Sequence, residues 1–102
     1  MEKWIIFFAE FNMAEEDLFT DTQLFLNREE AEVEMDSKKA YYTEIAKSPY
    51  KDQGLQHGRN FDVKVTEETT IDSNPVRTVH IQRITDLLEE HYQATMRLEK
   101  LV

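Results

Sequence analysis

The spacing of apolar residues changes from alternating to helical within the first third of the chain. Residues 2–11 include an uninterrupted apolar run, Trp4 to Ala9, with apolar side chains at both odd and even positions. We therefore predict that 2–11 form a strand inside a sheet, with cover needed on both faces. A short helical run is the alternative, but the aromatic and β-branched residues favour the strand. We expect a second short strand at 22–26, paired antiparallel with the first. Between them, residues 12–21 form either an acidic connector pinned to the sheet by its apolar residues or a single helical turn at 14–19.

A helix is predicted from Asn27 to just before Pro49. Asn27 and Glu30 have the spacing of a capping box, in which the Asn27 side chain accepts a hydrogen bond from an early backbone N–H. Pro49 cannot continue the helix, because it has no N–H and restricts the residue before it. Lys38 interrupts the apolar stripe; its stem either lies over the edge of the core, or its ammonium forms a buried ion pair or a partner contact. The stripe consists of Ala31, Met35, Tyr42, Ile45 and Ala46.

A hairpin is predicted in the second half of the chain. Apolar residues alternate with polar ones at 61–66 and again at 76–82, and a turn sequence occupies 72–75. Residues 50–60 contain both glycines of the chain and are predicted to form its one long loop. Such a composition is typical of functional loops and of merely flexible ones alike.

The last predicted element is a helix at 83–101, capped by Thr85. Its apolar positions recur at alternating spacings of four and three residues, as in a heptad stripe. In one interpretation the stripe packs on the sheet, and in the other it meets its own copy about a two-fold axis. In the second, charging of His91 below about pH 6.5 loosens the contact. The seam comprises Ile84, Leu88, His91, Thr95 and Leu98.

Together these elements predict a single α+β domain spanning 1–102. The expected order is strand, strand, helix, strand, strand, helix (ββαββα), with a mainly antiparallel four-stranded sheet covered by two helices. The longest apolar run, Trp4 to Ala9, is too short to cross a bilayer, so no membrane role is expected. The chain has no cysteine, which excludes disulfides and thiolate metal sites and favours a reducing, cytoplasmic location.

The net charge of −9 is concentrated in one third of the chain. Between Glu10 and Asp36 there are ten acids and one base, and elsewhere acids and bases cancel. This distribution predicts a negative face and opposes direct nucleic-acid binding, which requires clustered Lys and Arg; a general solubility role is the alternative. Three of the helix acids, Glu29, Glu32 and Asp36, are expected on the solvent side, away from the apolar stripe. The acids assigned to partner binding are Glu15, Glu16, Asp17, Asp21, Glu29, Glu32 and Asp36.

The sequence contains no recognisable catalytic or metal-binding motif. The three histidines, His57, His80 and His91, have no ligand spacing with one another, and none of the three serines has a nearby histidine. Glu30 and Glu34 lie one helical turn apart, but no calcium loop with its glycine surrounds them. We therefore predict no enzyme activity, no metal and no cofactor.

Three functional hypotheses are considered for these patterns. The first is a small non-enzymatic interaction protein of the inhibitor, immunity or nucleic-acid-mimic type, by analogy of size and charge, which docks its acidic face on a basic surface of a partner protein. The second is a structural homodimer, in which a second copy covers the apolar strand or the terminal helix. An uncharacterised enzyme or metal-binding domain is a third hypothesis. Salt weakens binding through the acidic face steeply but barely affects apolar self-association.

Overall fold

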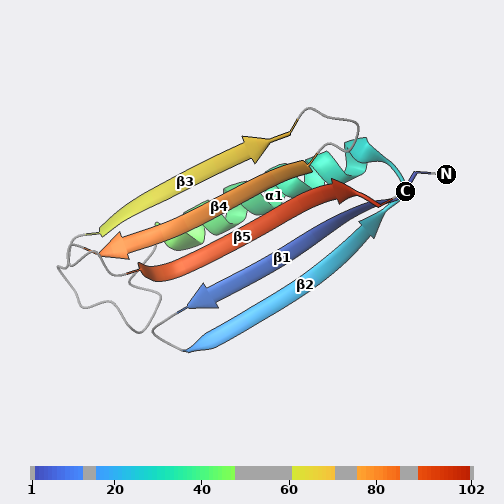
Figure 1. Ribbon diagram of the computed structural model, residues 1–102. Helices are drawn as coiled ribbons and strands as arrows, with labels where there is room; N and C mark the ends of the chain where they lie inside the picture. Colours follow the sequence, from blue (N-terminus) through green and yellow to red (C-terminus); the bar gives the residue numbers. More distant parts are fainter. Residues whose placement is uncertain (1, 13–15, 48–60, 71–75, 86–89, 102) are drawn as a thin grey trace.

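The computed structural model describes residues 2–12, 16–47, 61–70, 76–85 and 90–101, which form five strands and one helix in the order ββαβββ (Figure 1). The elements are β1 (Trp4–Asn12), β2 (Asp17–Phe25), α1 (Arg28–Ala46), β3 (Phe61–Thr69), β4 (Val76–Thr85) and β5 (Glu90–Lys100).

The strands form one antiparallel sheet in the order β2-β1-β5-β4-β3, and α1 lies across one of its faces (Figure 1). Three strands, β1, β5 and β4, occupy the interior of the sheet, each with a neighbour on both sides. The expected antiparallel pairing of the first two strands is confirmed, with Trp4 opposite Phe25 and Asn12 opposite Asp17. The predicted hairpin in the second half is also confirmed, since β3 pairs with β4.

Local signals position α1 as the sequence predicts. The Asn27 side chain accepts a hydrogen bond from the Glu30 backbone N–H at 2.8 Å, which caps the first turn. The helix ends at Ala46, with Lys47 as its C-cap, and Pro49 lies outside the described residues. The predicted stripe faces the sheet, because Ala31, Met35 and Ala46 are buried and the other two members pack against the same core.

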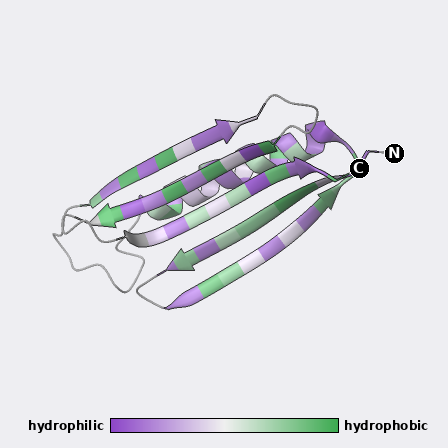
Figure 2. Ribbon diagram, in the orientation of Figure 1, coloured by the Kyte–Doolittle hydropathy of each residue, from purple (hydrophilic) through white to green (hydrophobic). Residues whose placement is uncertain are grey.

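The core lies between α1 and the helix-facing side of the sheet. Alternate residues of β1, β4 and β5 point into it, and burial of each large side chain stabilises the fold by about 1.5–3 kcal/mol. Figure 2 shows the contrast along the strands, with β1 hydrophobic over most of its length and β3 alternating. The buried strand residues are Trp4, Ile6, Phe8, Val79, Ile81, Arg83, Tyr92, Ala94, Met96 and Leu98.

The predicted helix at 83–101 and the four-stranded sheet under two helices are wrong. Among the residues that the structure describes, the sheet has five strands and one helix covers it. The last of these elements is β5, which pairs with β1 and β4. The period of two at Tyr92, Ala94, Met96 and Leu98 decides the structure, since all four are buried. Pairing on both sides satisfies the strand's backbone and outweighs the helix propensity of its Ala, Met, Leu, Glu and Lys residues.

The second strand is longer than predicted. β2 begins at Asp17 rather than at residue 22, so most of the expected acidic connector is strand. Its nine residues pair with β1 without interruption. Asp17, Phe19 and Asp21 therefore lie on the helix-facing side of the sheet, and Leu18 lies on the other side.

Candidate protein-binding surface

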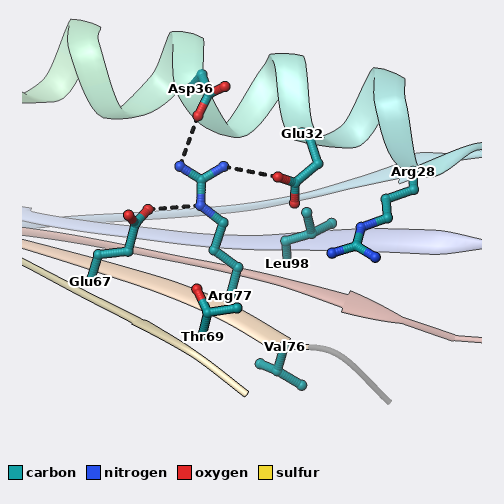
Figure 3. Close-up of a pocket in the computed structure, with 8 residues that line it drawn as sticks. All are labelled: Arg28, Glu32, Asp36, Glu67, Thr69, Val76, Arg77 and Leu98. Atoms are coloured by element: carbon teal, nitrogen blue, oxygen red, sulfur yellow. Dashed lines mark hydrogen bonds and ion pairs between the residues drawn. The ribbon is translucent and has the colours of Figure 1, made fainter. Parts of the chain in front are cut away.

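On one flank of α1, the side chain of Arg77 joins the helix to β3 and β4. Its Nη2 donates to Asp36 at 2.7 Å, its Nε to Glu67 at 2.7 Å and its Nη1 to Glu32 at 3.3 Å (Figure 3). Lys39 of the helix lies 3.6 Å from the same Glu67 carboxylate. A cleft of about 280 Å³ surrounds this group, and its lining comprises Arg28, Glu32, Asp36, Glu67, Thr69, Val76, Arg77 and Leu98.

The charges in this cleft neutralise one another. Burial alone lowers the pKa of Arg77, but hydrogen bonds and charge interactions with Asp36 and Glu67 outweigh it and raise the pKa. Arg77 therefore stays charged and holds carboxylates from two elements in fixed positions. This arrangement ties the helix to the sheet, and its donors already have acceptors within the protein.

A second arginine of β4 caps the other end of the helix. Arg83 is fully buried; its Nε donates to the Ala46 carbonyl at 2.8 Å and its Nη2 to the Ile45 carbonyl at 3.0 Å. The guanidinium lies 5.2 Å from the ring centroid of Tyr92. A cation suits the negative end of a helix dipole, and here it also binds two carbonyls of the last helical turn.

On the opposite flank, aromatic rings and carboxylates lie between α1 and the first two strands. The ammonium of Lys38 lies 5.0 Å from the Phe8 ring centroid and 3.8 Å from Glu34. Its stem thus covers the edge of the core while its charge pairs with a residue one turn away. The Tyr42 ring packs on Phe8 at 4.4 Å between centroids. Burial raises the pKa of Tyr42, and the nearby carboxylate of Glu10 raises it further, with smaller contributions from Tyr41 and Asp21.

β2, at the edge of the sheet on this flank, combines acids with exposed apolar side chains. Leu18, Phe19 and Leu24 are 63%, 51% and 67% exposed. Asp17 and Asp21 are also exposed, and within the described part of the chain neither forms an ion pair. β2 contains no Lys or Arg. An apolar surface with charge around it is typical of a protein-binding site.

The face of the sheet opposite α1 adds to this apolar surface. Ile5, Phe7, Ala9 and Phe11 of β1 share this face with Leu24, which lies directly opposite Ile5. Phe7 is 41% exposed. A shallow groove of about 370 Å³ follows the face, and its lining comprises Phe7, Phe8, Ala9, Thr20, Asp21, Thr22, Thr95 and Arg97. Further across, His80 Nδ1 and Thr95 Oγ1 share a hydrogen bond of 2.7 Å.

The predicted acidic residues do not form a single face. Glu16, Asp17 and Asp21 lie together at β2, whereas Glu32 and Asp36 bind Arg77 on the opposite flank. The expectation that the helix acids point away from the core is wrong for Glu32, which is half-buried against β4. Two further acids were assigned to partner binding. Glu29 is exposed in the first helical turn, and Glu15 lies outside the described residues.

The predicted seam at 84–98 is wrong because its residues do not lie on a helix. Ile84 belongs to β4, and Thr95 and Leu98 of β5 face opposite sides of the sheet. Leu88 and the side chain of His91 lie outside the described residues. A helical two-fold contact through His91 is therefore not retained.

Sequence reasoning missed Arg77 and Arg83, although the signal was present. Val79 and Ile81 alternate with polar residues in the predicted strand, and a period of two places Arg77 on their face. The same period, continued past residue 82, places Arg83 there too. Two arginines at inward positions require acceptors, and in this structure α1 supplies them.

Among the described residues, no group of three or more histidines, aspartates and glutamates is placed to hold a metal ion. The one described helix is not long and apolar enough to cross a membrane. Comparison of the chain with protein-family models, with curated proteins and with solved structures finds no match. The surface at β2 is therefore assessed on its own chemistry.

Proposed function

We propose that this protein is a small non-enzymatic binding protein that docks β2 and its surroundings on a basic surface of a partner protein. The observation that carries the proposal is the composition of β2, where Asp17 and Asp21 alternate with exposed Leu18, Phe19 and Leu24 and no base is present. The predicted acidic site is thereby narrowed to Glu16, Asp17 and Asp21.

The two kinds of side chain have different roles in such docking. Carboxylates steer a basic partner toward the surface and disfavour acidic ones, which affects the association rate and its salt dependence. The exposed leucines and Phe19 supply apolar area, which is removed from water in the complex. In contrast, Glu32, Asp36 and Glu67 are already bound to Arg77. The flank toward β3 and β4 therefore has fewer unpaired carboxylates for a basic partner.

Charge reversal on the two edge strands tests the proposal. The double variant Asp17→Lys, Asp21→Lys is compared with Asp62→Lys, Glu68→Lys, in which two exposed acids of β3 undergo the same change. Each variant and the original protein are immobilised, and the proteins captured from cells are identified by mass spectrometry. We expect the original protein and the β3 variant to capture the same basic proteins, and the β2 variant to lose them.

Equal capture by the two variants would contradict docking through β2. Circular dichroism of each variant checks that the fold is retained. A captured partner should also dissociate as salt rises toward 1 M, where the screening length falls to about 3 Å.

Self-association across the helix-free face of the sheet is the second candidate. The observation in its favour is that β1 presents Ile5, Phe7 and Phe11 on this face without any acid. In sheet-on-sheet contacts two such faces pack about 10 Å apart. The residues that β1 contributes to this face are uncharged, so they cause no repulsion between two copies. Light scattering at micromolar concentration is expected to give a dimer mass that Phe7→Thr reduces to that of the monomer. A monomer mass for the original protein would discard this candidate.

A further inference from the structure

The outer edge of β2 is a long, regular row of backbone hydrogen-bonding groups. Among the described residues, β2 pairs only with β1 and stands at the end of the sheet (Figure 1). In an antiparallel pair, every second residue points its N–H and C=O away from the neighbouring strand. The nine pairs between β1 and β2 run without a register shift, so no bulge interrupts this edge.

β2 lacks the lysine, the proline and the bulge that protect many edge strands, and its only charged residues are Asp17 and Asp21. Natural edge strands carry lysine, proline or a bulge, any of which discourages the addition of another strand. The other edge strand, β3, has Lys64 near its centre, and Glu67 of β3 is held by Arg77 and Lys39. β2 has neither lysine nor proline. The two ends of the sheet therefore differ in how readily they can accept a further strand.

The side chains of β2 define what kind of strand fits. Asp17, Phe19 and Asp21 lie on the helix-facing side of the sheet, whereas Leu18 and Leu24 lie on the opposite side with two threonines between them. Side chains directly across two strands interact most, and opposite charges or apolar pairs stabilise the pairing. A complementary strand has basic residues on the helix-facing side and apolar or β-branched residues on the other.

We propose that an extended segment of a partner protein adds to β2 as a sixth strand, and that this segment alternates Lys or Arg with apolar or β-branched residues. The inference rests on the proposed function and specifies how the partner is recognised. Backbone hydrogen bonds hold the added strand, and the alternation selects it. A second copy of β2 does not meet this requirement, because it contains no base, and a full antiparallel overlap of the two strands places Asp21 opposite Asp21.

Two synthetic peptides of identical composition provide the test. The first alternates lysine and valine over nine residues, and the second has the same lysines and valines in two separate blocks. Both have blocked termini, so they carry the same charge. Each is titrated into isotope-labelled protein at low salt, and affinity and backbone amide exchange are followed by nuclear magnetic resonance.

The alternating peptide is expected to bind more tightly than the block peptide by about tenfold or more. It should slow exchange at every second amide of β2 and leave the β3 amides unchanged. Asp17→Lys, Asp21→Lys should weaken its binding by about tenfold or more, since two attractive contacts become repulsive. Asp62→Lys, Glu68→Lys, which places the same charges on β3, should bind as the original protein does.

Each other outcome overturns the strand addition. If the two peptides bind equally and the β2 amides are not protected from exchange, the peptides are attracted by charge alone. That result contradicts strand addition but is compatible with the acidic docking surface. Equal protection of β2 and β3 removes the preference for one edge. Protection of β2 that grows with protein concentration in the absence of peptide identifies a second copy as the occupant. If neither peptide binds, strand addition is excluded, and the capture experiment separately decides the docking surface.

Discussion

The two flanks of α1 close the core by opposite means. Toward β3 and β4, the side chains of Arg77 and Arg83 cross from the sheet to the helix and bind carboxylates and backbone carbonyls. Toward β2, the contacts are aromatic, such as Phe8 with Tyr42, and the strand beyond them exposes acids and apolar side chains.

This difference shows that an edge strand can either be tied to the rest of the fold by side-chain bonds, as β3 is, or present its side chains to a partner, as β2 does. On the flank toward β3 and β4, polar groups are satisfied within the protein and contribute to stability. On the flank toward β2, charged and apolar groups are directed outward, where they add little to the fold. Substitutions on the first flank should therefore change stability, and those on the second should change binding.

The largest effect is expected at Arg83. Replacement by Met keeps an unbranched side chain of similar length but removes the donors to the Ile45 and Ala46 carbonyls. Because these bonds involve a buried charged group, we expect a loss of about 2–4 kcal/mol in the free energy of unfolding, measured in urea. Arg97→Met, at an exposed position of β5, is the control and should change the free energy by less than about 0.5 kcal/mol. Similar values for both variants would show that Arg83 does not secure this flank.

A smaller effect is expected at Arg77. Arg77→Met leaves Glu32, Asp36 and Glu67 close together without their shared cation. Since Asp36 is 67% exposed, solvent screens part of the interaction, and we expect a loss of about 1–2 kcal/mol. Adding Glu67→Gln to the variant should restore part of it, because one repelling charge is removed. A double variant less stable than Arg77→Met would contradict this account.

The smallest effect concerns Tyr42, whose ionisation responds to charge on the β2 flank. Burial and the carboxylates of Glu10 and Asp21 raise the pKa of Tyr42 above its ordinary value of 10.0. The folded state therefore holds the phenol proton more tightly than the unfolded state, and this contribution to stability is present below pH 10 and lost as pH rises through the folded pKa. Ultraviolet titration, with Tyr42→Phe as the reference, should show a lower pKa in Asp21→Asn. An unchanged pKa of Tyr42 in this variant would show that the charge of Asp21 does not affect the ionisation of Tyr42.

Sequence reasoning predicted the elements that are specified locally. The cap at Asn27 and the helical stripe around Met35 depend on residues within a few turns of one another, so their pattern could be interpreted without tertiary contacts. The strands β1, β3 and β4 also follow from their own alternation or apolar composition.

The last strand was assigned wrongly because two periods coexist in one segment. Leu98 fits both the heptad spacing and the alternation with Met96, and only the neighbours β1 and β4 decide between them. The candidate site was predicted only in part, because some of its contacts also depend on residues distant in sequence. Asp17 and Asp21 were identified from composition, but the use of Asp36 depends on Arg77, which lies 41 residues away in sequence.

The pairing of β1 with β5 joins segments that are far apart in the sequence, which has a consequence for the rate of folding. The two strands are nearly a full chain length apart in sequence. Their pairing continues one residue beyond each strand, where the Leu101 N–H donates to the Lys3 carbonyl at 2.7 Å. Closing such a long loop costs chain entropy before any contact compensates for it. Folding is therefore expected on the millisecond-to-second scale of topologies rich in non-local pairs. Before β5 pairs with β1, the β1–β2 hairpin has two open edges, and the strand that later becomes an interior one is exposed.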